Sequence, residues 1–277
     1  MSIPEHHRHW LLELLIWWEG RITPRQLAEH WQVSRQHASS LLQDYLKAHP
    51  NSLDYQPSNK DYQPTEHFQP RLLTQDVTEY LEWATRQTLP PRKDNLSQLP
   101  HEILQHPPRR ATPQIMRPLV QALRENRRLD VGYISLTHPD NQGRIIIPHH
   151  FVNNGQRWHL RAWCEKSQGF RDFVLSRFRG EPELLDTSPI TPDQDEGWNT
   201  QLTLILEPDP RLTPQQKQVL EEDYAMQNGQ LKINTRACLA NYLLKSLQVH
   251  PRILEGEPEA QQLVIVNKDD IKPWLFG

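Results

Sequence analysis

The chain has 277 residues, of which 36% are hydrophobic and 23% charged, and its formal net charge is −3. This length predicts two or three domains, and the apolar share excludes a mostly disordered chain. Cys164 and Cys238 are the only cysteines, which excludes a disulfide framework, and no apolar run is long enough for a membrane span. We therefore expect a cytoplasmic protein with no membrane partner.

The charged residues are unevenly distributed along the chain. Residues 101–180 carry 13 Lys or Arg and 6 Asp or Glu, and 12 of these 13 basic residues are arginines, whereas residues 181–277 carry 8 and 16. The planar guanidinium fork of arginine suits phosphate and carboxylate groups. The central segment is either a phosphate-binding surface or a basic strip that pairs with the acidic tail, and charge alone favours neither.

Residues 8–48 have the pattern of three short helices. Apolar residues from Trp10 to Trp18 form one face of the first helix, although Glu13 interrupts the run. Thr23-Pro24-Arg25-Gln26 is a capping box with proline at the first helical position, and Ser34 is placed to cap the third helix. Residues 53–57 and 61–65 then flank a polar turn, which predicts a small β-hairpin.

Two helices joined by a short turn and followed by a hairpin are the layout of a winged helix-turn-helix, which places its second helix in the DNA major groove. The candidate DNA-binding residues lie in three places: in the first turn of the third helix, along the side of that helix opposite its apolar face, and at the hairpin tip. They are Ser34, Arg35, Gln36, His37, Ser40, Gln43, Lys47 and Lys60. An ordinary three-helix bundle with a solvated polar face is the alternative. Residues 1–50 hold five basic and five acidic side chains, so a dimer is favoured because it makes more phosphate contacts.

The remaining helices and strands are predicted from changes in the period of the hydrophobic pattern along the chain. A helix is predicted over 74–87, a proline-rich linker over 88–111 and a helix from Thr112-Pro113. Period-2 patterns then predict a small antiparallel sheet or barrel, with strands at 129–137, 144–152, 156–164 and 170–178. After a polar linker at 186–198, a small α+β domain is predicted, with strands at 201–207, 230–235 and 262–267 and helices at 213–226 and 236–247.

Strand parity separates two kinds of side chain in residues 156–164. One face is apolar and contains Trp158, Leu160, Ala162 and Cys164, whereas the other contains Arg157, His159, Arg161 and Trp163. Unpaired charges are costly in a core, and an Arg, His and Trp face suits base stacking and phosphate pairing. A set of surface ion pairs is the alternative.

Three segments of this central region resemble a WYL domain. They are Ile147-Pro148-His149, the stretch from Gly155 to Cys164, and the stretch from Phe170 to Arg177. Trp158-His159-Leu160 occupies the place of the Trp-Tyr-Leu run that names the family, with His in the middle. The resemblance implies an Sm-like, SH3-type β-barrel between an N-terminal winged helix and a C-terminal extension, in a dimeric transcriptional regulator. These sequence variants are similar to regulators encoded beside BREX and CBASS phage-defence systems.

The resemblance also implies a ligand site. Members of the family are thought to sense a nucleotide or nucleic-acid fragment through polar positions of the barrel. The positions implied here are Ser135, His149, His159, Arg161, Arg171 and Arg177, with His159 at the Tyr position. Histidine could stack on a base or, when charged, bind phosphate.

Together these patterns predict an α+β multidomain chain with a winged helix-turn-helix at 1–95, a linker and connecting helix at 96–128, the WYL barrel at 129–190 and a C-terminal α+β extension at 191–277. We expect a homodimeric repressor of a phage-defence operon that binds an inverted-repeat operator and responds to a phosphate-bearing effector. The alternatives are an adaptor that binds RNA or single strands through the barrel, and a metal-dependent nuclease.

Motifs for catalysis are weak in this sequence. The run from His101 to His106 has one residue too many for the H-E-x-x-H zinc motif, and neither G-x-S-x-G nor a Gly-rich phosphate loop occurs. We therefore expect no enzyme activity, no cofactor and no metal.

Overall fold

The computed structural model describes residues 5–86, 107, 109–137, 139, 143–251 and 257–275. The chain divides into two compact units, residues 1–151 with 158–188 and residues 152–157 with 189–277, and each is treated by itself. Most of the predicted proline-rich linker and the whole run from His101 to His106 lie outside the described residues. Within these ranges, no helix combines the length and the apolar character that crossing a membrane needs.

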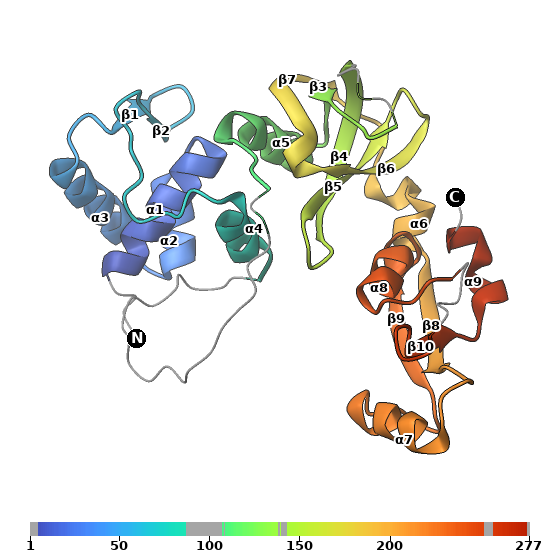
Figure 1. The fold of residues 1–277 in the computed structure, drawn as a ribbon. Helices are drawn as coiled ribbons and strands as arrows, with labels where there is room; N and C mark the ends of the chain where they lie inside the picture. The colour runs from blue at the N-terminus through green and yellow to red at the C-terminus, as the bar shows by residue number, and fades with distance from the viewer. Residues whose placement is uncertain are drawn as a thin grey trace. The chain divides into compact units, whose positions relative to one another are not determined.

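The first unit begins with the predicted winged helix-turn-helix (Figure 1), whose elements are α1 (Glu5–Glu19), α2 (Pro24–Trp31), α3 (Arg35–Ala48), β1 (Leu53–Gln56), β2 (Asp61–Pro64) and α4 (Val77–Arg86). The Thr23 capping box is present, and the Ser34 hydroxyl accepts the backbone N–H of His37 at 3.2 Å. Ile22 and Tyr62 exchange two backbone hydrogen bonds of 2.9 and 2.8 Å, which adds a third strand position to the hairpin.

A five-stranded antiparallel sheet follows, built from β3 (Arg127–Tyr133), β4 (Gly143–Asn153), β5 (Trp158–Cys164), β6 (Gly169–Val174) and β7 (Phe178–Thr187), in the order β6-β5-β4-β3-β7. The prediction of four strands is wrong. The fourth ends at Val174 in a 3-10 turn (Leu175–Arg177), and β7 was missed because Gly180, at φ 71°, and Pro182 interrupt its alternation. In the described part of the chain no pairing joins the edge strands β6 and β7, so a closed Sm-like barrel is not confirmed.

Helix α5 (Pro113–Glu125) connects the winged helix to this sheet. Figure 1 shows it beside β3 and β7, and it also packs against α1. Its apolar residues Met116, Leu119 and Val120 are buried in a hydrophobic cluster that extends from α1 to the strands. The helix ends at Asn126, in a left-handed conformation, and β3 begins at the next residue. The winged helix and the sheet therefore share one core across α5.

The second unit is the predicted small α+β domain, with the strand order β10-β8-β9. Its elements are α6 (Glu196–Asn199), β8 (Gln201–Pro208), α7 (Pro214–Asp223), β9 (Leu231–Arg236), α8 (Ala240–Ser246), β10 (Leu263–Ile265) and α9 (Lys268–Leu275), with 3-10 turns at Pro192–Gln194 and Ala237–Leu239. Leu204 and Leu206 of β8 pack with Leu244 of α8 and Ile271 of α9 in a separate core. Helix α9 was not predicted, since it is short and contains Pro273.

An ion pair between the buried Asp209 and the partly exposed Arg211, after β8, is expected to give this unit a pH dependence. The Asp209 carboxylate accepts Arg211 Nε at 2.9 Å and Arg211 Nη2 at 2.7 Å, and these hydrogen bonds lower the pKa of Asp209. A lowered pKa stabilises the fold above the pKa of the unfolded chain, about 4, and this stabilisation is lost as the pH falls through the folded value. We expect Asp209→Asn to lower the melting temperature of the second unit at pH 7.

Calorimetry of the full chain checks this expectation. The gap between the wild type and Asp209→Asn should begin to narrow as the pH falls below about 4, where the unfolded chain takes up a proton, and should close once the pH is below the lowered pKa of folded Asp209. The exposed pair Arg25–Glu29 supplies the control, because Glu29→Gln should change the melting temperature little at either pH. An equal gap at pH 7 and at pH 3 would contradict the assignment.

Candidate nucleic-acid interface and ligand-binding surface

The predicted DNA-binding residues are all exposed and lie along α3, at its N-cap and on the wing hairpin, a set called here the recognition surface. Residues 34–37 cover the first turn of α3, Ser40, Gln43 and Lys47 follow along it, and all seven are exposed, as is Lys60 at the hairpin tip. The opposite face of α3 buries Ala38, Leu42 and Tyr45. The expected division of α3 into a core face and a polar outer face is therefore confirmed.

Two tyrosines of the wing extend this surface and were missed by the sequence analysis. Tyr55 of β1 and Tyr62 of β2 are cross-strand partners, and their ring centroids lie 5.0 Å apart. The Tyr62 hydroxyl accepts a 3.1 Å hydrogen bond from Gln43 Nε2, while the Tyr55 ring is 50% exposed. The available signal was a tyrosine in each strand of the hairpin that follows the third helix.

The positive charge of this surface is small. Lys47 Nζ lies 3.1 Å from the Asp44 carboxylate, so part of its charge is neutralised within α3. Arg35 and Lys60 are the other cations among the eight candidates. The recognition surface therefore has more hydrogen-bonding groups than positive charges. This favours hydrogen bonds to the edges of the DNA bases over tight binding to the DNA phosphate backbone.

The second candidate site lies on the sheet, at His149, His159 and Arg161, all of which are buried. The pairing of β5 with β6 decides which side chains share a face. Arg161 pairs with Asp172, and Leu160 pairs with Phe173. Cross-strand partners project on the same side of a sheet. Leu160 and Phe173 belong to the core, so His159, Arg161 and Asp172 project from the other face.

This second face contains an ion pair beside an aromatic group. Arg161 Nη1 lies 3.2 Å from Asp172 Oδ1, and the two side chains are only 10% and 14% exposed. Phe170 contacts Trp163 of β5 and His149 of β4, with ring centroids 5.2 and 5.5 Å away. Guanidinium, imidazole and indole groups of this kind can pair with phosphate and stack on a base.

The structure does not bring all six predicted ligand-binding residues together. Arg171 pairs with Ala162 and so projects from the same face as Leu160 and Phe173, opposite to Arg161. Arg177 ends the 3-10 turn after β6, where its carbonyl accepts the backbone N–H of Ile134 at 3.1 Å. Ser135 follows β3, with its hydroxyl 3.1 Å from that of Thr137. Only His149, His159 and Arg161 are assigned to the second face.

A winged helix-turn-helix joined through one helix to a five-stranded sheet, with a further α+β unit, defines a class of modular DNA-binding regulators. Residues 5–86 match the family described as the BrxR transcriptional regulator winged helix-turn-helix domain. Residues 114–180 match the WYL domain, and residues 201–271 match the BrxR transcriptional regulator C-terminal dimerization domain.

Curated relatives cover nearly the whole chain. The DNA-binding transcriptional repressor CapW of Pseudomonas aeruginosa is 32% identical over 259 residues, which are 92% of this chain and 86% of that protein. CapW of Escherichia coli (strain KTE188) is 32% identical over 268 residues, with the same coverage. A solved structure, proteasome accessory factor B/C of Arthrobacter aurescens, aligns over 99% of this chain and 48% of its own at 17% identity, and its TM-score of 0.27 carries no weight for the fold.

The chain therefore belongs to the family of WYL-domain transcriptional regulators that includes CapW. The predicted resemblance to regulators of this type is confirmed, and the family agrees with the expectation that the chain is a regulator rather than an enzyme.

Proposed function

We propose that this chain is a DNA-binding transcriptional repressor that acts as a homodimer on an inverted repeat before a phage-defence operon. The observation that carries the proposal is the exposed polar surface of α3 and the wing, held over a buried apolar face. The names of the curated relatives and the match of residues 201–271 to a dimerization domain support it. Binding to chromosomal DNA would place the protein in the cytoplasm, and a two-fold dimer calls for half-sites about one or more 10-bp turns apart.

The proposal includes control by a phosphate-bearing nucleotide or nucleic-acid effector. Its support is the second face of the sheet, which holds His149, His159 and Arg161 and where the Phe170 ring contacts His149 and Trp163. An effector shifts the protein between two states only if it binds them with unequal affinity. We also propose that this central module has the Sm-like barrel architecture. The proposed limits are 1–95 for the winged helix-turn-helix, 96–128 for the linker and connecting helix, 129–190 for the WYL module and 191–277 for the C-terminal extension.

The recognition surface is tested by changing its first turn. We expect the double variant Arg35→Ala with Gln36→Ala to weaken operator binding roughly 10- to 100-fold at fixed salt, since one base contact contributes about 1–3 kcal/mol. Gel-shift titration of the operator measures this. Lys217→Ala with Gln218→Ala on α7 is the matched control, a cation and an amide removed from a helix of the other unit.

Unchanged operator binding by the first double variant would show that α3 is not the recognition helix. Single-stranded oligonucleotides in the same assay test the adaptor alternative. Tighter binding to single strands than to duplex operator would favour the adaptor over the repressor.

A further inference from the structure

A pocket of about 420 Å³ lies within the first unit, between the end of α1, the wing and α5. Residues from all three elements line it, among them Arg21 after α1, Asn59 and Gln63 of the wing, and Arg117 and Arg124 of α5. No residue of the recognition surface or of the second sheet face lines it. Its volume falls in the range of pockets that take small ligands, about 300–1,000 Å³.

The lining of this pocket is positively charged. Three arginines, Arg21, Arg117 and Arg124, line it, against Glu19 as the acidic lining residue. The formal charge of the lining is therefore +2, which is opposite in sign and similar in size to the charge of a phosphate monoester near neutral pH, about −2. Asn59 also lines this space, whereas the amide nitrogens of Gln63 and Gln121 donate to the carboxylates of Asp61 and Glu125.

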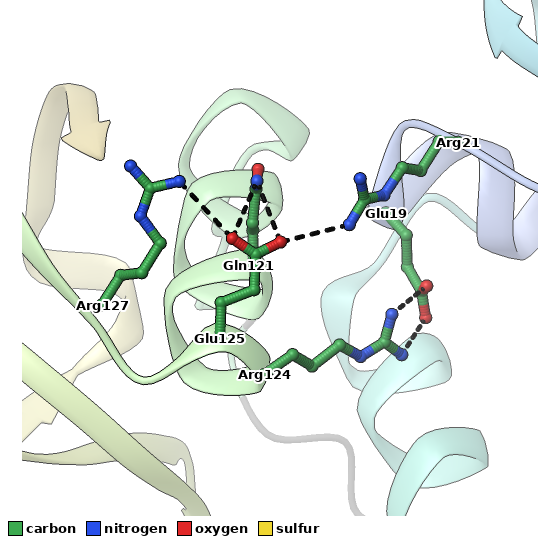
Figure 2. Close-up of polar contacts among 6 residues, drawn as sticks. All are labelled: Glu19, Arg21, Gln121, Arg124, Glu125 and Arg127. Carbon is green, nitrogen blue, oxygen red and sulfur yellow. Dashed lines mark hydrogen bonds and ion pairs between the residues drawn. The ribbon is translucent and has the colours of Figure 1, made fainter. Parts of the chain in front are cut away.

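The ion pairs around the pocket hold these arginines without saturating them (Figure 2). Arg124 donates to both oxygens of Glu19, a carboxylate that is only 4% exposed, and its own side chain stays 50% exposed. Arg21 reaches Glu125 at 3.4 Å, while Gln121 and Arg127 hold that same carboxylate. Each guanidinium has five N–H donors, so Arg21 and Arg124 retain donors for a further oxyanion.

Arg117 has a different role at the pocket wall. Its Nε donates to the carbonyl oxygen of Trp17 at 3.0 Å, and its Nη2 lies 3.4 Å from the carbonyl oxygen of Ile16. Arg117 therefore provides hydrogen-bond donors for two carbonyl groups at the C-terminal end of α1. Gly20 follows at φ 75°, and a Cβ there would lie 3.0 Å from Arg117 Cδ. Arg117 thus fixes the wall, while Arg21 and Arg124 are the arginines with exposed side chains that can bind.

We propose that this pocket binds a phosphate group through Arg21 and Arg124, as an anion site separate from the second face of the sheet. The phosphate is either that of a free nucleotide or one of the DNA backbone beside the wing. Both kinds of phosphate would pair with the same two guanidinium groups. If the phosphate belongs to DNA, Arg21 and Arg124 would add positive charge for DNA binding that α3 lacks. Since α5 leads directly into β3, occupancy would fix the wing against the helix that carries the sheet.

The first arm of the test uses AMP and inorganic phosphate, titrated by calorimetry into the full chain in an Arg161→Ala background that removes binding at the sheet face. We expect Arg21→Gln to raise the AMP dissociation constant at least tenfold. Asn59→Asp, which adds a negative charge to the lining, should act in the same direction. Arg25→Gln is the matched control, since it removes an exposed arginine of α2 outside the pocket.

The second arm measures duplex operator binding as a function of salt. If the source is a DNA backbone phosphate, AMP does not bind, and Arg21→Gln weakens duplex binding and lowers the salt slope by about 1, whereas Lys217→Gln on α7 does not. If Arg21→Gln leaves AMP binding as in Arg25→Gln, and duplex affinity and salt slope as in Lys217→Gln, the proposal is overturned. The free-phosphate arm needs no DNA, so its outcome is distinct from that of the repressor proposal.

Discussion

Replacing Glu13 with Ala is expected to lower the free energy of unfolding of the winged helix by about 1–3 kcal/mol, the cost of leaving a buried hydrogen-bond donor without its acceptor. Glu13 lies in the middle of α1 and is 1% exposed. Its Oε1 accepts the Tyr45 hydroxyl at 3.2 Å, and its Oε2 accepts the backbone N–H groups of Arg71 and Leu72 at 2.8 and 2.9 Å. One carboxylate therefore joins α1, the recognition helix and the segment before α4.

Removing the carboxylate takes the acceptor from the buried Tyr45 hydroxyl and from two backbone N–H groups that are partly buried. Burial, and then the nearby Glu13 charge, raises the pKa of the Tyr45 phenol, so it remains a donor at neutral pH. Leaving the buried Tyr45 donor without an acceptor costs about 1–3 kcal/mol. Since a domain has only about 5–15 kcal/mol in total, Glu13→Ala should remove a substantial part of the stability of the winged helix.

Hydrogen–deuterium exchange of the full chain measures this effect locally. Amides of α3 should exchange much faster in Glu13→Ala, whereas those of β8 in the second unit should be unchanged. Glu13→Gln should be intermediate, because its single carbonyl oxygen can replace only one of the two acceptors. Glu29→Gln, an exposed change on α2, is the control. Protection of α3 equal to that in the wild type would contradict the structural role given to Glu13.

Local chemistry made much of the winged helix predictable from the sequence. The Thr23 capping box, the Ser34 cap and the polar turn before Asp61 each specify a backbone conformation through neighbouring residues, and the structure contains all three. Glu13 was visible only as an interruption of an apolar run. Its partners at Tyr45, Arg71 and Leu72 are far away in the sequence, so no local pattern could identify its role.

The sheet shows a second limit of sequence patterns. Parity within a strand assigns side chains to two faces, but it does not give the register between strands. Arg161 and Arg171 are both odd-numbered, yet Arg161 pairs with Asp172 and Arg171 with Ala162, so the two arginines project on opposite faces. Likewise, β7 carries Gly180 and Pro182, which hide its alternation, and it is recognisable only through its pairing with β3.

Arg161 and Arg171 project from opposite faces of the sheet, so their substitutions are expected to affect ligand binding differently. With AMP and an oligothymidylate as probes, we expect Arg161→Ala to weaken ligand binding at the sheet at least tenfold and to abolish ligand-dependent release of the operator. The reason is the loss of a guanidinium that pairs with Asp172 beside the Phe170 and Trp163 rings. Arg171→Ala, which removes an exposed arginine from the other face, should change ligand binding less than twofold.

Arg161→Lys separates charge from geometry in the same experiment. Lysine keeps the positive charge but loses the planar fork, so a site that grips phosphate through two parallel N–H groups should recover only part of its affinity. Arg161→Ala breaks an ion pair that is largely buried, so a lower melting temperature is expected for it. Each variant is therefore assayed well below its own melting temperature, and its operator binding without ligand must stay near the wild-type value, so that loss of response is not loss of fold. If Arg171→Ala abolished the response while Arg161→Ala retained it, the ligand would bind on the core side of the sheet edge, and the assignment to the second face would be wrong.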